Sequence, residues 1–480
     1  MALRVYNTLT RTKEEFKPRE GNKVSIYVCG VTPYNYCHVG NARPYVVWDV
    51  IRRYLEYRGY DVFHVQNFTD VDDKIIARAA QEGKTPGEIA DKYIAEYFAD
   101  MDALGILRAH IYPRVTEHID DIIEMVQGLI EKGYAYEVDG DVYYDVTRFA
   151  EYGKLSGRSL EEMRAGARVE VDEKKAHPMD FALWKRAKPG EIAWDSPWGK
   201  GRPGWHIECS VMSHKYLGDT FDFHGGGVDL IFPHHENEIA QTEAYTGKPF
   251  VRYWLHNGFV NFSGEKMAKS VGNVITIREA CRQYSGMALR LALLSTHYRS
   301  PIDFDLEKLA AAQRGWERLQ NAWEGMEQVL GRQGDLPLEK GKLSERARNL
   351  LDRAGEAETK FVEAMDDDFN TALAVGVLFD LTREINSFLR EPLTTGEDKA
   401  ALARAREAFR TIAAVLGLLP AAEKAAADSL EEELLQLIID IRQEARKRKD
   451  FALADSIRER LGRLGIILED TPQGVRYRRR

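Results

Sequence analysis

Cysteine is scarce in this sequence: the only thiols among 480 residues are Cys29, Cys37, Cys209 and Cys281. So few thiols in so long a chain cannot form a disulfide framework, which excludes the class of small disulfide-rich secreted proteins. In a reducing compartment, such a residue is either a small buried side chain or a candidate for thiolate chemistry or metal binding. We therefore consider each of the four as a possible metal ligand.

Long apolar runs are also lacking. No segment reaches the ~18 apolar residues of a membrane-spanning helix, and the start, Met1-Ala-Leu-Arg-Val-Tyr6, has no apolar core of a signal peptide. The composition, 44% hydrophobic and 30% charged, is that of an ordinary globular protein. We expect a cytoplasmic monomer without a membrane partner, built from roughly three or more domains because single cores stop growing near ~250 residues.

Charge is unevenly distributed along the chain. The net charge is -9, yet residues 442–480 contain twelve Lys and Arg against six Asp and Glu. A basic tail on an acidic body indicates either a polyanion that docks at one end or a solvated helix face, and charge alone does not separate the two.

Short β-branched runs alternate with longer helical ones near the start of the chain. They are Val24–Val28, Ala42–Tyr57, Asp61–Val65 and Val71–Glu82. This alternation predicts βαβ units on a parallel sheet.

The later segments predict further parts around and after that sheet. Residues 134–145 have the pattern of a hairpin with an Asp139-Gly140 turn, within an insertion at about 110–200. The sheet resumes with a helix at 207–217 and a strand at 251–256. From about Asp305, Ala, Leu, Glu and Arg recur with helical spacing and predict a helical bundle, and the chain ends in a predicted hairpin around 471–474.

Two short motifs are suited to binding phosphate. His38-Val39-Gly40-Asn41 stands between the first strand and its helix, and a helix entry favours anions. Lys266-Met-Ala-Lys269-Ser270 places two ammonium groups in a stretch of small and polar residues, and mobile lysines suit a transient polyphosphate. Taken singly, such motifs also occur as plain helix starts and solvated loops.

A third motif contains candidate zinc ligands. In residues 233–238, His234 and Glu238 stand four apart, which places them on one face of a helix that Pro233 is suited to begin. Thiolates could complete the set of ligands, since zinc accepts sulfur, imidazole and carboxylate. The candidates are Cys209 and one of Cys29 and Cys37, between which spacing does not decide.

These motifs resemble those of a known family. The His38 and Lys266 motifs resemble the two signature sequences of class I aminoacyl-tRNA synthetases, which position the triphosphate of ATP, although Val39, Asn41 and Ala268 replace commoner residues. Further segments are similar to the cysteinyl-tRNA synthetase family in the same order. They are Cys29–Thr32, Asn67–Lys74, Gly204–Cys209, Phe232–Glu238, Lys449–Asp455 and Leu468–Gly474.

The resemblance implies a role for particular residues. One zinc ion per chain would be held by Cys29, Cys209, His234 and Glu238. Catalysis, and ATP binding with Mg²⁺, would use His38, Asn41, Lys266 and Lys269. Ribose would be bound near Gly227 and Asp229, and the amino acid near Thr69 and Trp205. The tRNA would be contacted by Arg446, Lys447, Arg448, Lys449 and Tyr477.

The resemblance also implies a fold and a reaction. The fold would be α/β: a Rossmann-type parallel-sheet catalytic domain with an insertion, then an α-helical bundle and a small mixed α/β C-terminal domain. The reaction would be ATP-dependent ligation of L-cysteine to tRNA(Cys) through cysteinyl-adenylate, with zinc recognising the thiol. The expected domains are a split Rossmann domain (1–110 and 201–258), a connective insertion (111–200), a stem-contact region (259–310), the bundle (311–420) and an anticodon-binding domain (421–480).

Two other functions compete with this one. A cysteine ligase that passes the adenylate to an amino sugar would need only the catalytic half, so the basic C-terminal part argues against it. A non-catalytic zinc protein that binds RNA would have no use for a triphosphate site, so His38, Lys266 and Lys269 argue against that.

Overall fold

A computed structural model describes residues 2–166, 174–262, 265–266, 274–331, 343–393, 395–419, 429–471 and 474–479. The chain divides into two compact units. The first comprises Met1–Gln313 and Glu363–Leu373, and the second comprises Arg314–Val362 and Ala374–Arg480.

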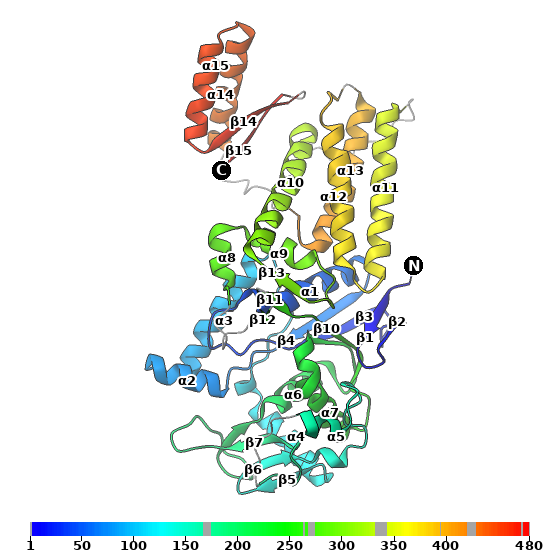
Figure 1. Ribbon diagram of the computed structural model, residues 1–480, viewed down its shortest axis with the longest axis vertical. Coiled ribbons are helices and arrows are strands. Elements are labelled where there is room, and N and C mark those ends of the chain that lie inside the picture. Colours follow the sequence, from blue (N-terminus) through cyan, green and yellow to red (C-terminus); the bar gives the residue numbers. More distant parts are fainter. Residues whose placement is uncertain are drawn as a thin grey trace. The chain divides into compact units, whose positions relative to one another are not determined.

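A parallel sheet forms the centre of the first unit. Its strands are β3 (Lys23–Val28), β4 (Asp61–Gln66), β9 (Phe221–Gly227) and β10 (Val251–Asn257), in the order β10-β9-β3-β4. Figure 1 labels β3, β4 and β10 of this sheet. Val28 pairs with both Gln66 and Gly225, so the carboxyl ends of three strands meet at one edge. The predicted parallel sheet is confirmed, and strands far apart in sequence bring their last residues together.

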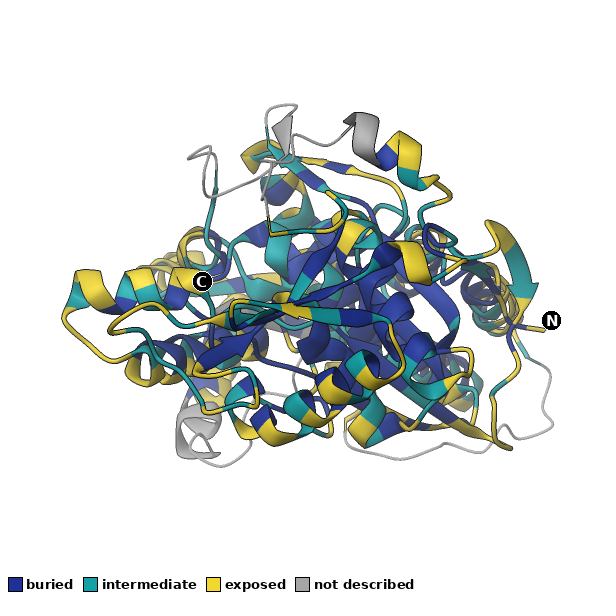
Figure 2. Cartoon of the chain, turned by 90° about the horizontal axis from the view of Figure 1, so that it is seen from below, coloured by how far each residue is buried: buried dark blue, intermediate teal, exposed yellow. Residues whose placement is uncertain are grey.

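Helix α1 (Val39–Tyr57) connects β3 to β4 as predicted. The apolar residues of its sequence face the sheet, and Trp48 packs against Phe223 of β9 with ring centroids 6.1 Å apart. Buried residues gather in the interior in Figure 2, whereas exposed ones occupy the outward turns of the helices. None of the described helices is long and apolar enough to cross a membrane.

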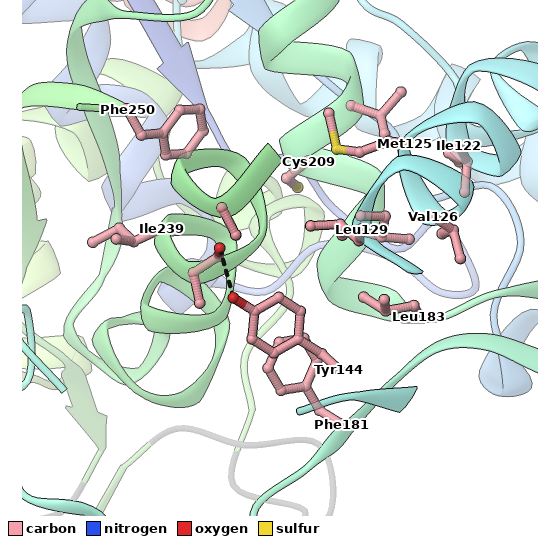
Figure 3. Packing of buried hydrophobic residues seen from close by; sticks show 14 of the residues in the cluster. Ile122, Met125, Val126, Leu129, Tyr144, Phe181, Leu183, Cys209, Ile239 and Phe250 are labelled. Atoms are coloured by element: carbon pink, nitrogen blue, oxygen red, sulfur yellow. Dashed lines mark hydrogen bonds between the residues drawn. The ribbon is translucent and has the colours of Figure 1, made fainter. Parts of the chain in front are cut away.

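The insertion forms its own antiparallel sheet in the order β5-β6-β7-β8. The predicted hairpin is confirmed, because Asp139 and Gly140 both have positive φ (52° and 87°), as a two-residue hairpin turn requires. Its strands share a hydrophobic core with neighbouring helices of the first unit (Figure 3), where the Tyr144 hydroxyl donates to the Ala240 carbonyl at 2.9 Å. The strands are β5 (Ala135–Val138), β6 (Asp141–Tyr144), β7 (Phe181–Arg186) and β8 (Gly201–Pro203).

The remaining elements of the first unit surround these two sheets. The helices are α2 (Asp73–Glu82), α3 (Pro86–Ala103), α4 (Ile119–Glu131), α5 (Leu160–Gly166), α6 (Trp205–Leu217), α7 (Glu236–Thr246), α8 (Ile277–Gln283) and α9 (Gly286–Leu294), with short turns η1 (Val115–Glu117), η2 (Val146–Arg148), η3 (Val228–Leu230) and η4 (Ile231–His235). The strands are β1 (Arg4–Asn7), β2 (Thr12–Glu15), β11 (Val260–Phe262), β12 (Glu265–Lys266) and β13 (Ile302–Phe304).

The second unit is mostly helical, as the spacing predicted. Its elements are α10 (Leu306–Leu330), α11 (Glu345–Asp366), α12 (Thr371–Phe388), α13 (Gly396–Leu416), α14 (Ser429–Lys447), α15 (Phe451–Arg463), β14 (Ile466–Thr471) and β15 (Gly474–Arg479). The first residues of α10, the end of α11 and the start of α12 belong to the first unit. The last four elements enclose a small apolar cluster that includes Leu435, Leu461 and Val475. The predicted final hairpin is present as β14 and β15.

The predicted start of a helix at Pro233 agrees with the backbone dihedral angles. The regular helix α7 begins at Glu236 and is preceded by the π-helical turn η4, in which Phe232 is the residue with extended dihedral angles (φ -140°, ψ 132°), so the chain is helical from Pro233 onward. His234 and Glu238 lie side by side, with 3.0 Å between His234 Nε2 and Glu238 Oε1. The predicted domain boundaries remain predictions.

Candidate active site

A cluster of four potential metal ligands lies at the carboxyl edge of the parallel sheet. It comprises Cys29 after β3, Cys209 on α6, His234 on the turn before α7, and Glu238 on α7, and their ligand atoms all lie within 4.8 Å of one another. Cys29 Sγ is 3.8 Å from both Cys209 Sγ and Glu238 Oε1. A tetrahedral zinc site with Zn–S bonds of 2.3 Å has sulfurs about 3.8 Å apart, so the spacing of the two sulfurs fits zinc.

The protonation of these groups also suits a cation. Burial opposes charge on Glu238, but His224 and His234 outweigh it and lower the pKa of Glu238 to about 2. A hydrogen bond from Cys29 lowers the pKa of Cys209 to about 6, whereas burial raises the pKa of Cys29 well above its ordinary value. The two thiols thus share a proton, which a metal ion would displace because metals bind thiolates.

Two histidines that the sequence reasoning missed lie beside this cluster. His224, His235, Cys29 and Glu238 form a second overlapping group with ligand atoms within 4.8 Å. The first group offers two sulfur atoms and the second offers one. Zinc is a borderline-soft ion that binds thiolates well, so the first group is the better zinc site. His224 Nε2 lies 2.8 Å from the other carboxylate oxygen of Glu238, the position of a residue that orients a ligand.

The signals for these histidines were weak in the sequence. His224 precedes three glycines and His235 stands next to His234, and no spacing motif in the sequence marks either of them as a ligand. Their role depends on β9 lying between β3 and β10. This order brings His224 against Glu238, and it brings His235 against His256 of β10, with 2.8 Å between His235 Nδ1 and His256 Nε2.

The two predicted amino-acid-binding residues lie near the ligand cluster. The ring of Trp205, 42% exposed, stacks on His234 with centroids 4.2 Å apart. Thr69 is buried and accepts a hydrogen bond from the Asn67 amide at 3.4 Å, and Asn67 Oδ1 in turn accepts from the Gly30 N–H at 2.9 Å. Asn67 was not predicted as a site residue, although it opens the segment that contains Thr69.

The His38 motif lies at the start of α1 as predicted. The His38 N–H donates to Asn41 Oδ1 at 3.1 Å, so the side-chain oxygen of Asn41 caps the helix. The Nδ2 group of the same side chain is the atom that can donate a hydrogen bond to a ligand. The Val39 N–H donates to the Ile275 carbonyl at 2.9 Å, which holds the segment after the lysine motif against the His38 motif. Lys266 ends β12, but its side chain and the whole of Lys269 lie outside the described residues.

Gly227 and Asp229 stand at the end of β9, where the chain turns into η3. A Cβ atom at Gly227 would crowd the end of the Asp229 carboxylate, so glycine leaves room for this side chain in its present position. The turn brings Asp229 to the same edge of the sheet as the potential metal ligands.

The predicted tRNA-binding residues lie at the end of α14 and on β15. Arg446 pairs with Asp470 at 2.8 Å, and Arg448 pairs with Glu444 at 3.3 Å across exposed surface. Tyr477 packs against the apolar cluster of α14, α15 and β14, so part of its ring is covered. Lys447 and Lys449 carry the remaining charge of this segment.

Solved structures define the class of protein that has this fold. A methionyl-tRNA synthetase from Mycobacterium tuberculosis in complex with methionyl-adenylate has a TM-score of 0.60 and 17% identity, covering 82% of this chain and 90% of its own. The leucyl enzyme of Agrobacterium radiobacter K84 in its tRNA complex has a TM-score of 0.63 and 12% identity, covering 84% and 85%. The fold is that of the class I aminoacyl-tRNA synthetases, as predicted.

Sequence comparison narrows the class to one family. Residues 15–314 match the family of tRNA synthetases class I (C) catalytic domains, 360–420 a DALR domain, and 435–478 the cysteinyl-tRNA ligase anticodon binding domain. The cysteine–tRNA ligases of Pelotomaculum thermopropionicum and Heliobacterium modesticaldum are each 56% identical to the chain, over 99% and 100% of its length and all of their own. The chain belongs to the cysteine–tRNA ligase family of class I enzymes.

Proposed function

We propose that this enzyme activates L-cysteine with ATP to cysteinyl-adenylate, transfers the cysteinyl group to tRNA(Cys), and selects cysteine through a zinc ion. The observation that carries the proposal is the meeting of Cys29, Cys209, His234 and Glu238 within 4.8 Å, beside the exposed ring of Trp205. This arrangement supports a sulfur-rich metal site that an amino acid could reach beside Trp205.

The four ligands would hold one zinc ion per chain, and His224 would orient Glu238 through its 2.8 Å contact. When bound, zinc would favour a thiol that can ionise over the much less acidic hydroxyl of serine. Thr69 and Trp205 would border the amino and carboxyl groups of the substrate. Because the distinguishing group itself is engaged, discrimination of about 10⁴ to 10⁵ is attainable without a proofreading site.

Adenylate formation would depend on positioning and charge. The substrate carboxylate attacks the α-phosphorus of ATP and pyrophosphate leaves, so donors that meet the developing charge lower the barrier. His38 and Asn41 at the N-terminus of α1 would bind phosphate oxygens, and Lys266 and Lys269 would neutralise the leaving pyrophosphate. Mg²⁺ would accompany ATP.

Two further groups would bind the nucleotide and the RNA. Gly227 and Asp229 would receive the ribose hydroxyls, the carboxylate accepting their hydrogen bonds. Lys447, Arg448 and Lys449, with Arg446 and Tyr477 beside them, would meet the phosphates and bases of tRNA(Cys).

Metal analysis combined with amino-acid activation tests this proposal. We expect about one zinc per chain and pyrophosphate exchange that depends on cysteine, with serine at least about 10⁴-fold poorer. Cys209→Ser should lose zinc and selectivity together, while Cys281→Ser, a matched substitution on α8 outside both ligand groups, should keep both. A zinc-free active enzyme, or equal activation of cysteine and serine, would refute the proposal.

A further inference from the structure

An acidic turn between α11 and α12 belongs to the first unit, although both helices continue into the second. It is formed by residues 366–369, with the sequence Asp-Asp-Asp-Phe. Asp368 and Phe369 both have left-handed backbone angles, with φ of 63° and 50°. A bulky residue such as Phe369 rarely adopts such angles, and backbone strain of this kind clusters at functional sites. The turn is therefore a candidate for a role beyond joining two helices.

The Asp368 side chain is fully buried and accepts hydrogen bonds from three groups. Its Oδ1 atom accepts from the Tyr6 N–H and from the Tyr298 hydroxyl, each at 2.8 Å, and its Oδ2 atom accepts from Arg299 Nε at 2.7 Å. Its backbone carbonyl accepts from His297 Nε2 at 3.1 Å. Asp368 thus bonds three consecutive side chains, those of residues 297–299.

Residues 297–299 precede β13 and support the start of β11. The Tyr298 carbonyl accepts from the Gly258 N–H at 2.8 Å, and a Cβ atom at Gly258 would lie 2.7 Å from backbone atoms of Ser300. The segments before β11 and β13 are therefore in close backbone contact. β11 pairs in parallel with β13 and in antiparallel with β12, which ends at Lys266. A continuous set of contacts thus leads from Asp368 to the start of the lysine motif.

The other buried carboxylate of the turn contacts a different element. Asp366 Oδ1 accepts from the Tyr54 hydroxyl at 2.7 Å and from Arg58, at the C-terminal end of α1. That end is about 28 Å along the helix from the His38 motif, since α1 has 19 residues. The two aspartates thus hold different parts of the first unit, and Asp368 is bonded to the segment that supports β11.

On the basis of the proposed function of the lysine motif, we propose that Asp368 is a positioning residue for adenylate formation. It holds β11 and β12 in the place from which the lysine motif acts on the leaving pyrophosphate. Asp368 acts through residues 297–299 and the strands that they support. A neutral side chain at this position would weaken the bond to Arg299 and loosen these strands, while the proposed metal ligands would stay in place.

The full-length Asp368→Asn variant tests this role, because asparagine is similar in size and tolerates left-handed backbone angles. It removes the charge that Arg299 meets. We expect the kcat of cysteine-dependent pyrophosphate exchange to fall about tenfold or more, while the KM for cysteine and the zinc content stay within about twofold of wild type. Tyr298→Phe, which removes one hydroxyl, should lower kcat in the same selective way by about threefold, and it keeps the role testable if the asparagine variant folds poorly.

Asp366→Asn is the matched control. It makes the same change at a buried aspartate of the same turn, whose partners Tyr54 and Arg58 belong to the far end of α1. Its kcat should stay within about twofold of wild type, even where its unfolding midpoint falls. An equal fall of kcat in both aspartate variants, or no fall in Asp368→Asn and Tyr298→Phe, would overturn the positioning role.

Combination with Lys269→Ala separates positioning from a purely structural role. If Asp368 acts through the lysine motif, Asp368→Asn should lower exchange by less than about twofold once Lys269 is already replaced, since residues that act as a unit are not additive. Full additivity of the two effects would overturn the positioning role, because the turn would then serve the fold alone.

The proposed reaction and the role of Asp368 can fail separately. If the wild-type chain shows no cysteine-dependent exchange, the proposed reaction itself fails. If wild-type exchange is normal and Lys269→Ala loses it, but Asp368→Asn and Tyr298→Phe exchange like wild type, the positioning role fails alone.

Discussion

His64 on β4 shows how burial of one side chain makes stability depend on pH. The side chain is 5% exposed, and burial, reinforced by the nearby charges of Arg52 and His110, lowers the pKa of His64 to about 3. In the unfolded chain its pKa is about 6.5. Between these values the unfolded state binds a proton that the folded state does not, so the free energy of unfolding falls as pH decreases, by at most about 1.4 kcal/mol per pH unit.

We therefore predict that His64→Gln makes stability less sensitive to acid. Above pH 6.5 the stabilising effect of a neutral His64 is fully present, and it is lost progressively as pH falls toward 3. When the free energy of unfolding is measured with urea at pH 7, 6 and 5 and plotted against pH, the wild-type curve should be steeper than that of the variant. Parallel curves would show that burial of His64 does not contribute to the acid sensitivity.

A second prediction at this scale concerns Lys269, whose role rests on the motif because the residue lies outside the described part. Lys269→Ala should lower cysteine-dependent pyrophosphate exchange by about 10² or more, as expected when a contact to transition-state charge is lost. Zinc content and the unfolding midpoint should not change. Lys84→Ala, which removes an exposed lysine after α2, serves as the control, and normal turnover of the Lys269 variant would contradict its assigned role.

The proposed zinc ligands were predictable from sequence only in part. The pair His234 and Glu238 follows from a four-residue spacing, but the choice of Cys29 over Cys37 came from resemblance. The structure gives a physical reason: Cys29 directly follows β3 at the sheet edge, whereas Cys37 lies beside the α1 entry and its carbonyl accepts from the Ile277 N–H. His224 was missed because its contact with Glu238 depends on the order of strands, which no local pattern contains.

At the scale of elements, Arg43 connects α1 to the strands that support the lysine motif. Its side chain is fully buried, and its guanidinium donates to the carbonyls of Gly258 (2.7 Å), Phe259 (2.9 Å), His297 (3.1 Å) and Ser300. Burial lowers the pKa of Arg43 to about 10, so the group remains charged at neutral pH. These carbonyls belong to the segments that enter β11 and β13, so one cation fixes both.

We predict that Arg43→Met lowers the free energy of unfolding by about 3 kcal/mol or more, because several buried carbonyls would lose their partner. Denaturant unfolding monitored by circular dichroism measures the loss. Arg148→Met, at an exposed arginine after β6, should change stability by less than about 0.5 kcal/mol. A similar small change at both sites would mean that the carbonyls find other donors.

Elements were predicted best where periodicity was strong and flanking turns were local. The β5–β6 hairpin followed from Asp139-Gly140, and α12 followed from helical spacing. Two details depended on tertiary packing. A Cβ at Gly225 of β9 would collide with Trp48 of α1, so the close approach of this helix to the strand requires glycine there, and His224 on the same strand reaches Glu238 of α7. Neither constraint is visible within a window of neighbouring residues.

At the scale of the whole molecule, the proposed chemistry and the basic C-terminal segment occupy different units. The proposed zinc ligands, His38 and Asp229 all belong to the first unit, whereas residues 429–479 contain their own apolar cluster and a separate ion-pair network. In that network Asp470 forms ion pairs with Arg442, Arg446 and Arg458. These arginines lower the pKa of Asp470 to about 2, and the hydrogen bond from Arg442 has the largest effect. Loss of this segment should therefore leave the adenylation site intact.

Truncation before Ala422 tests this separation of roles. Because no proposed adenylation residue lies beyond the first unit, cysteine-dependent pyrophosphate exchange should stay within about twofold of the full chain. Charging of tRNA(Cys) should fall about tenfold or more in kcat/KM, since twelve basic residues between 442 and 480 would be removed with the segment. Comparable loss of exchange and charging, with unchanged zinc content, would show instead that the segment supports the fold of the catalytic unit.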